Sequence, residues 1–525
     1  MIAFTAADGL TPAEVQAAQG KNDPRLVGQG LKNQRLRLIS LAELSHGPVS
    51  GRPLTGAEMN VGAPEIPEAY NWSPNGDAIV FAHCPSPQPN VWPGTRLALL
   101  TLADGSVQPL GGQETTAFNP HFSPDGRWIA YKAYDTPAWE WSSVVHVLSL
   151  EGGDSHPLAE THDRRPDLIG WSADGQQLYF QETVGTHHYL GALPVDGSPP
   201  MLLFEWEGCI ENVRLNQSRS AMGFTLQTPS QPPEAYLTQL VEFSPVQMSW
   251  VNAEFSLLPL GRTEVIRWRS VDGLEIEGLL TYPVEYEQGQ RYPLLVSVHG
   301  GPAIAWMQFF IGLQSFYGPI ATFASRGYAI LRCNVRGSTG YGKAFRRGNY
   351  RDWGGRDVQD LLAGVDHVIA LGIADPERLG ITGWSYGGYL TAATLTQTGR
   401  FRAAVIGSGM VNLVSYALGN DSPDYLPSHF GGEVWEVADL LLERSPITHA
   451  DRVTTPTLIL HGENDQRVPI WQGYEFHNAL KRCGIPTRMV IYPRSGHVPS
   501  EPKMLLDVME RILAWMEKYL VQEDH

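Results

Sequence analysis

The sequence contains little cysteine and no long apolar run. Its 525 residues include four cysteines, which lie far apart and follow no metal-ligand spacing. This usage predicts reduced, mostly buried thiols and is typical of a cytoplasmic protein without a disulfide framework. No apolar run approaches the roughly 18 residues of a membrane-spanning helix. The N-terminus lacks a basic segment followed by an apolar one, so we also expect no signal peptide.

Positive charge is scarce as well. Lysine and arginine number 38 against 55 aspartates and glutamates, a formal net charge of −17, and the basic residues form no cluster. We therefore expect neither nucleic acid nor a membrane surface as a partner. The composition, 42% hydrophobic and 18% charged, is that of a globular protein. At this length we expect two large cores rather than one.

One phrase recurs in the first half of the chain: an aromatic residue, a Ser-(Pro/Ala)-(Asn/Asp)-Gly turn and an alternating strand. It begins at Trp72, Phe122 and Trp171, and a degenerate copy runs from Leu215 to Phe224. A β unit repeated about every fifty residues is typical of a propeller blade, which cannot bury both of its faces alone. We therefore predict a β-propeller domain over residues 1–258, with about five blades and a ring that could remain open. A β-sandwich with similar hairpins is the alternative.

The pattern changes in the second half. From about residue 259 onward, apolar runs such as 293–299 and 456–460 alternate with stretches of helical periodicity such as Val358–Ala370. This alternation predicts a mostly parallel sheet covered by helices, with functional groups at the carboxyl ends of the strands.

A serine stands at one of these strand ends. Residues 383–387 are Gly-Trp-Ser-Tyr-Gly, directly after the predicted strand 379–383 and before a helix expected from Tyr389 to Thr398. G-x-S-x-G is a sharp strand-to-helix turn that raises the serine hydroxyl above the sheet. Ser385 is therefore a candidate nucleophile. In a chain with 54 glycines the match also arises by chance, so an ordinary turn is the alternative.

A serine nucleophile needs a base, and the base needs an orienting carboxylate. In α/β-hydrolases these partners follow the serine in the order Asp/Glu and then His. Glu463 and Asp465 follow the predicted strand 456–460, and His497 follows the last predicted strand, 487–492. We therefore predict an α/β-hydrolase domain over residues 259–525. Their positions alone do not decide whether Glu463 or Asp465 is the orienting carboxylate.

The reaction also needs hydrogen-bond donors for an oxyanion. The backbone N–H of Tyr386, the residue after the serine, supplies one. We expect the second from the sequence His-Gly-Gly-Pro at 299–302, and choose the N–H of Gly301. A plain tight turn is the alternative there. This chemistry requires no metal and no cofactor.

Together these features resemble the prolyl oligopeptidase family of serine peptidases. The matching motifs are the propeller repeats, His-Gly-Gly-Pro at 299–302, Gly-Trp-Ser-Tyr-Gly-Gly-Tyr at 383–389, His-Gly-Glu-Asn-Asp at 461–465 and Ser-Gly-His at 495–497. The resemblance covers nearly the whole chain. Within the family the acylaminoacyl-peptidase branch is the most similar, because His299 stands where other branches have an oxyanion-donating tyrosine.

The resemblance implies a triad of Ser385, Asp465 and His497, and so favours Asp465 over the neighbouring glutamate. It also implies that Gly301 and Tyr386 are the oxyanion donors. The expected activity is that of a cytoplasmic hydrolase of short peptides, which releases N-acylated residues or cleaves after small or apolar residues. Its propeller would screen access to the site, and with an incomplete ring a second copy of the chain could serve as the gate.

Three alternatives remain. A carboxylesterase would use the same triad, although small esters need no sieve. A dipeptidyl aminopeptidase would need paired glutamates, and the chain contains no Glu-Glu dipeptide. A non-catalytic scaffold would not need an intact triad.

Substrate contacts are less defined by the sequence. Arg467 is a candidate, because a guanidinium can bind a peptide carbonyl or a terminal carboxylate, but an ion pair that braces the loop would explain it equally well. Candidate pocket walls are Trp306, Phe309, Phe310 and the region 412–435.

Overall fold

The computed structural model describes residues 1–521 except 25, 28–29, 41–50, 63–68, 112–115, 135–141 and 314–315. The chain forms two compact units. One comprises Met1–Gln181 and Gly191–Met201, and the other comprises Glu182–Leu190 and Leu202–His525. Among the described residues, no helix has the length and apolar character needed to cross a bilayer.

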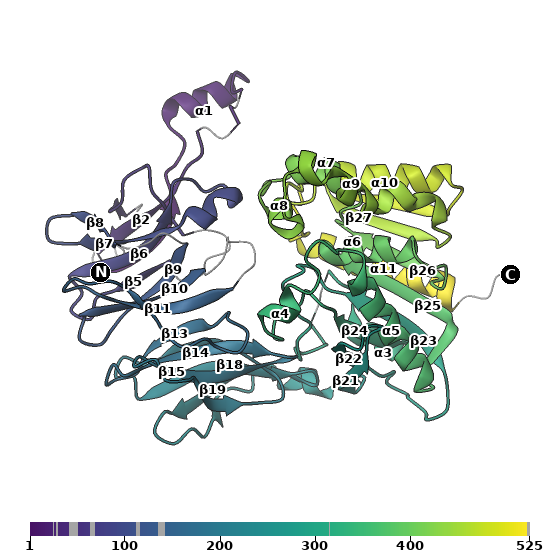
Figure 1. Cartoon of the computed structure of the whole chain (residues 1–525), viewed down its shortest axis with the longest axis horizontal. Coiled ribbons are helices and arrows are strands. Elements are labelled where there is room, and N and C mark those ends of the chain that lie inside the picture. The colour runs from purple at the N-terminus through teal and green to yellow at the C-terminus, as the bar shows by residue number, and fades with distance from the viewer. Residues whose placement is uncertain are drawn as a thin grey trace. The chain divides into compact units, whose positions relative to one another are not determined.

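The N-terminal part of the chain is built from antiparallel sheets, and Figure 1 labels several of their strands. Its strands are β1 (Ile2–Ala7), β2 (Gln34–Ile39), β3 (Arg52–Pro53), β4 (Asn60–Val61), β5 (Tyr70–Trp72), β6 (Ala78–Cys84), β7 (Arg96–Thr101), β8 (Val107–Pro109), β9 (Ala117–Phe122), β10 (Trp128–Tyr134), β11 (Ser143–Ser149), β12 (His156–Pro157), β13 (Asp167–Trp171), β14 (Gln177–Val184), β15 (His187–Pro194) and β16 (Met201–Glu205). They form the sheets β1–β3, β4–β8, β9–β12 and β13–β16. Helix α1 (Pro12–Gln19) and the 3₁₀ helix η1 (Pro89–Gly94) interrupt them.

The repeated phrase forms the same hairpin turn in three of these sheets. The hydroxyl oxygen of its serine (Ser73, Ser123 and Ser172) accepts the backbone N–H five residues later at 2.9, 3.0 and 3.0 Å. The glycine three residues after the serine has a φ of 74°, 74° and 69°, a conformation that favours glycine. The sequence repeat is therefore a structural repeat, and the N-terminal β domain is confirmed.

Consecutive repeats are joined by side chains as well as by packing. The indole Nε1 of Trp171 donates to the carbonyl of His121, fifty residues earlier, at 3.0 Å. The carbonyl oxygen of the Asn71 side chain accepts the N–H of Phe122, fifty-one residues later, at 3.0 Å. Equivalent positions of successive repeats thus lie next to one another.

The second unit contains a further antiparallel sheet and one large mixed sheet. The first consists of β17 (Cys209–Leu215), β18 (Ala221–Thr228), β19 (Gln231–Gln239) and β20 (Val246–Gln247). The second has the order β21-β22-β24-β23-β25-β26-β27-β28. Its strands are β21 (Thr263–Arg269), β22 (Glu275–Thr281), β23 (Tyr292–Val298), β24 (Ala329–Asn334), β25 (Ala374–Trp384), β26 (Ala403–Gly407), β27 (Thr457–Gly462) and β28 (Thr487–Tyr492). From β24 to β28 all neighbours run parallel.

Helices connect and cover the large sheet, as Figure 1 shows. They are α3 (Ile320–Ser325), α4 (Lys343–Arg346), α5 (Arg356–Ala370), α6 (Tyr386–Leu395), α7 (Leu413–Gly419), α8 (Tyr425–Phe430), α9 (Val434–Glu443), α10 (Trp471–Arg482) and α11 (Pro502–Leu520), with the 3₁₀ helix η4 (Pro446–Arg452). The 3₁₀ helix η3 (Ala253–Leu257) precedes β21 and contacts β19 instead. The predicted α/β-hydrolase domain is confirmed.

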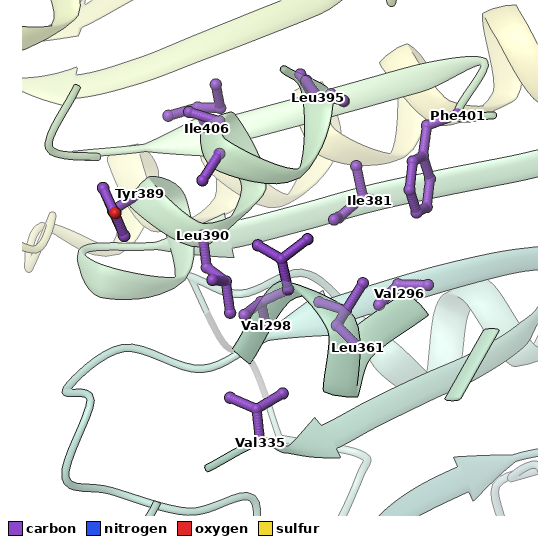
Figure 2. Packing of buried hydrophobic residues seen from close by; sticks show 14 of the residues in the cluster. Val296, Val298, Val335, Leu361, Ile381, Tyr389, Leu390, Leu395, Phe401 and Ile406 are labelled. Atoms are coloured by element: carbon purple, nitrogen blue, oxygen red, sulfur yellow. The ribbon is translucent and has the colours of Figure 1, made fainter. Parts of the chain in front are cut away.

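Both faces of the large sheet are buried. Val296 and Val298 of β23 and Ile381 of β25 pack in one layer with Leu361 of α5 and Leu390 of α6 (Figure 2). Residues of the alternate register contribute to a second cluster with α3 and α11 on the other face. Strands covered on both faces are apolar throughout, which explains the continuous runs in the sequence.

Candidate active site

Ser385 occupies a sharp turn between β25, which ends at Trp384, and α6, which begins at Tyr386. Its φ of 61° and ψ of −122° are unusual for a residue with a side chain. The Ser385 N–H donates to the carbonyl of Gly407 at 2.8 Å, and its carbonyl accepts the N–H of Tyr389 at 2.9 Å. The strained turn is thus held by the neighbouring strand and by the helix that follows.

The helix starts three residues earlier than the sequence predicted, at Tyr386 rather than Tyr389. The two glycines in its first turn reduced its apparent helical character, but they are needed for close packing. A Cβ atom on Gly387 would lie 2.2 Å from the carbonyl oxygen of Val298, and one on Gly388 would lie 2.7 Å from that of Gly407. Only glycine lets α6 approach the strands this closely.

Asp465 and His497 meet at the carboxyl ends of β27 and β28. Nδ1 of His497 lies 2.8 Å from Oδ2 of Asp465. A carboxylate can only accept, so Nδ1 carries the proton and Nε2 remains the basic nitrogen. The Asp465 side chain is fully buried, whereas that of His497 is 24% exposed. The buried carboxylate therefore orients the His497 ring, while part of the ring stays accessible to solvent.

The carboxylate of Asp465 is kept ionised by its surroundings. Burial alone would raise its pKa, but hydrogen bonds from His461 and His497 outweigh burial and hold the pKa well below its usual value. Its other oxygen, Oδ1, accepts the backbone N–H groups of Arg467 at 3.0 Å and Val468 at 2.9 Å. The neighbouring Glu463 instead accepts the N–H of Arg494 at 3.2 Å on the surface.

The loop with His497 is fastened to the serine turn. The indole Nε1 of Trp384, the residue before Ser385, donates to the carbonyl of His497 at 2.8 Å. The backbone of this loop also touches the end of β27, because a Cβ atom on Gly462 would lie 1.9 Å from the carbonyl oxygen of Gly496. The three residues of the predicted triad thus come from neighbouring turns at one edge of the parallel sheet.

The loop after β23 passes directly beside the serine. A Cβ atom on Gly300 would lie 3.5 Å from Cβ of Ser385. The Gly300 N–H donates to the hydroxyl of Tyr317 at 2.8 Å, and the Gly301 carbonyl accepts the hydroxyl of Tyr425 at 2.9 Å. Gly301 has a φ of 110°, in the region that favours glycine. Two tyrosines therefore fix the loop from which the second oxyanion donor was predicted.

The other predicted donor lies at the start of α6. The N–H of Tyr386 belongs to the first turn, whose N–H groups have no acceptor within the helix. The helix dipole adds positive potential at this end. His299 is fully buried nearby, and burial lowers its pKa to about 4, so it is neutral.

The remaining predicted residues have structural partners. Nε of Arg467, on the loop after β27, donates to Asp421 at 2.8 Å and forms an ion pair with it. Nε1 of Trp306 donates to the carbonyl of Ser297 at 3.0 Å. Phe310 is buried, whereas Phe309 is partly exposed. No cluster of metal-ligating side chains occurs in the described part of the chain.

Sequence reasoning did not assign a role to His461, which the structure places against the triad. Its buried Nε2 lies 2.7 Å from the carbonyl oxygen of Val468 and 3.5 Å from Oδ2 of Asp465. Both neighbours are acceptors, so Nε2 carries the proton. The sequence signal that could have indicated this contact is the position of His461 in the motif His-Gly-Glu-Asn-Asp, four residues before Asp465. Nothing in the residue pattern, however, shows that its side chain turns inward.

Comparison with known proteins identifies related sequences. Residues 314–523 match the sequence model of the prolyl oligopeptidase family. The uncharacterized peptidase YuxL of Bacillus subtilis is 31% identical over 72% of this chain and 56% of that protein. The acylamino-acid-releasing enzyme of Mus musculus is 25% identical, and the alignment covers 94% of this chain and 71% of that enzyme. The chain therefore spans little more than half the length of its Bacillus relative.

The fold is also that of a solved structure. The uncomplexed acylaminoacyl peptidase of Pyrococcus horikoshii matches with a TM-score of 0.73 at 23% identity, over 87% of this chain and 72% of that chain. Residues 314–523 thus belong by sequence to the prolyl oligopeptidase family, and the chain as a whole is similar to acylamino-acid-releasing enzymes.

Proposed function

We propose that the protein is a serine peptidase that hydrolyses short peptides through an acyl-enzyme on Ser385. The observation that carries the proposal is the partly buried Asp465–His497 hydrogen bond of 2.8 Å, whose histidine lies on a loop fastened to the serine turn. A nucleophile, a base and an oriented carboxylate in chain order Ser, Asp, His are the arrangement that acyl transfer needs.

The steps follow from the proton positions. Nε2 of His497 takes the hydroxyl proton of Ser385 as its oxygen attacks the substrate carbonyl carbon. The N–H groups of Gly301 and Tyr386 donate to the oxygen that becomes negative. His497 then gives the proton to the leaving amine, the C–N bond breaks, and the acyl group remains on Ser385. A water molecule, deprotonated by His497, hydrolyses the ester and restores the serine.

The substrate class is proposed from the relatives. The name of the mouse protein, acylamino-acid-releasing enzyme, favours release of N-acylated residues. Cleavage of oligopeptides after small or apolar residues is the other form of the proposal. A carboxylesterase and a dipeptidyl aminopeptidase remain the alternatives. For Arg467, the ion pair with Asp421 favours a bracing role over a substrate contact.

The same proposal includes an N-terminal propeller over residues 1–258 and a hydrolase domain over 259–525. The described residues form five antiparallel sheets in succession, and three of them contain the same hairpin turn, which supports an open or five-bladed ring. We place the protein in the cytoplasm, because all four cysteines are free and three of them are buried.

The test is hydrolysis of an acetyl-alanine anilide compared with a nitrophenyl acetate ester. The proposal expects turnover of the anilide by the wild type and none by Ser385→Ala. The matched control is Ser408→Ala, because Ser408 follows the adjacent strand β26, has a φ of 40° and is buried with an unpaired hydroxyl. This variant should retain activity. Ester turnover with negligible anilide turnover would establish the esterase instead.

Digestion of a peptide library with and without N-terminal acetylation would then define the cleavage position. Preference for acetylated peptides and release of their first residue would support the acylaminoacyl type. Preference for free amino termini would support the dipeptidyl type.

A further inference from the structure

The side chain of Tyr386 lies in a buried network next to the serine turn. Its ring is fully buried, and its hydroxyl donates a hydrogen bond to Oδ2 of Asp357. Nδ2 of Asn349 donates to the same hydroxyl at 3.1 Å. The ring of Trp353 meets that of Tyr386 edge-on, with centroids 5.0 Å apart. The phenol is thus held by two polar contacts and by packing.

Asp357 is the fixed end of this network. It is fully buried in the first turn of α5, where Oδ1 accepts the N–H of Val358 at 2.8 Å and Oδ2 accepts that of Gly354 at 3.2 Å. Burial, opposed by the Tyr386 hydrogen bond and reinforced by the charge of Asp360, raises the pKa of Asp357 to about 7. Burying a carboxyl group at such a position is costly for the fold. The contact that holds the phenol therefore comes at a cost in folding free energy, which is the burial of the Asp357 carboxyl group.

The backbone of Tyr386 is the part that faces the reaction. The peptide group between Ser385 and Tyr386 has its carbonyl fixed by the N–H of Tyr389 at 2.9 Å. In a trans peptide the N–H points opposite to the carbonyl, and here that direction is out of the N-terminus of α6. The side chain of Tyr386 and its amide nitrogen are bonded to the same Cα atom. Anchoring the phenol therefore limits rotation of the peptide group that carries the N–H.

We propose that Asp357 is a positioning residue: by holding the phenol of Tyr386, it fixes the Tyr386 N–H in the direction required by an oxyanion formed at Ser385. The inference rests on the proposed function, because only acyl transfer at Ser385 uses this N–H. Asp357 touches no reacting atom. Oxyanion donors act through preorganisation, so a small displacement lowers the rate of the chemical step and leaves substrate binding intact.

The test compares Asp357→Ala, Tyr386→Phe and the double variant with the wild type, using the full chain and acetyl-alanine anilide. Inhibition by an acetyl-alanine boronic acid is measured in parallel, because its tetrahedral adduct places an oxygen where the oxyanion forms. We expect kcat to fall about tenfold to hundredfold in each single variant, with Ki for the boronic acid rising in proportion. KM should change less than about twofold. Both substitutions break the same Asp357–Tyr386 hydrogen bond, so the double variant should be no slower than the poorer single variant.

Asp360→Asn is the matched control. Asp360 is equally buried on the same helix, but it pairs with Arg336 at 2.7 Å and, among the described residues, makes no hydrogen bond to Tyr386. This variant should lower Tm while leaving kcat and Ki within about twofold. If Asp357→Ala and Tyr386→Phe behave in the same way, Asp357 only stabilises the fold and the inference is wrong.

Misfolding of a variant and inactivity of the wild type have separate consequences. If Asp357→Ala does not fold, Tyr386→Phe decides, because it keeps the buried ring and removes only the hydroxyl. If the wild type neither cleaves the anilide nor binds the boronic acid, the proposed function fails, and the inference fails with it. An active wild type with unaffected variants overturns the inference alone.

Discussion

Replacing Asp465 by asparagine should remove most of the activity without unfolding the protein. Oδ1 of Asp465 accepts the N–H groups of Arg467 and Val468 at 3.0 and 2.9 Å, while Oδ2 faces Nδ1 of His497 at 2.8 Å. The oxygen of the asparagine must face the two backbone donors, because its NH₂ group cannot accept a hydrogen bond. The NH₂ group then faces His497 and favours the tautomer with the proton on Nε2.

That tautomer cannot accept the proton of Ser385. By analogy with other serine hydrolases we expect kcat to fall about 10⁴-fold, with KM unchanged. The loss corresponds to about 5 kcal/mol of activation free energy. The assay is the hydrolysis of acetyl-alanine anilide near neutral pH, together with Tm as a measure of folding.

Glu463→Gln is the control, since Glu463 lies two residues earlier and contacts Arg494 at the surface. It should retain its kcat and KM. If Asp465→Asn keeps more than about a tenth of the wild-type kcat, or if Glu463→Gln is the more damaging change, the assignment of the orienting carboxylate is wrong.

Three other predictions follow from particular contacts. His461→Leu removes a hydrogen-bond donor from Asp465, so kcat should fall about fivefold to tenfold at constant KM, and an unchanged kcat would contradict a role in orienting the carboxylate. Gly387→Ala should destabilise the fold by about 1–3 kcal/mol, measured by denaturant unfolding, because its Cβ atom would meet the backbone of Val298. Gly94→Ala, with nothing within 4 Å of the new atom, is its control, and equal losses would refute the packing argument. Asp357 has its pKa raised from 3.8 to about 7, chiefly by burial, so the folded chain retains a proton that the unfolded chain releases between these values. The stability of the wild type relative to Asp357→Asn should therefore fall as the pH rises through this window and level off above about 7; a Tm difference independent of pH would contradict the shift.

Much of the site could be predicted because its chemistry is local in sequence. The serine turn, the loop after β23 and the loop with His497 each follow a strand, and parallel strands bring their carboxyl ends to one edge. The apolar runs of β23, β25 and β27 were recognisable because these strands are buried on both faces.

Other features depend on contacts between distant residues and left no pattern in the sequence. Asp465 and Glu463 lie on one loop, and their positions alone do not say which of them faces His497; the resemblance favoured Asp465, and the fold shows the contact. The contact between Asp357 and Tyr386 joins two helices across 29 residues. The start of α6 was missed because two glycines required by close packing resemble a loop. The helical period cannot reveal such a requirement.

The central claim is that Ser385 is the nucleophile, and the most direct test is to locate a covalent adduct. The full chain is treated with a fluorophosphonate, digested, and analysed by mass spectrometry. The account predicts one phosphonyl group on the peptide that contains Ser385, no labelling of Ser385→Ala, and slow labelling of Asp465→Asn. Equal labelling of the wild type and Ser385→Ala, or an adduct on another residue, would contradict it.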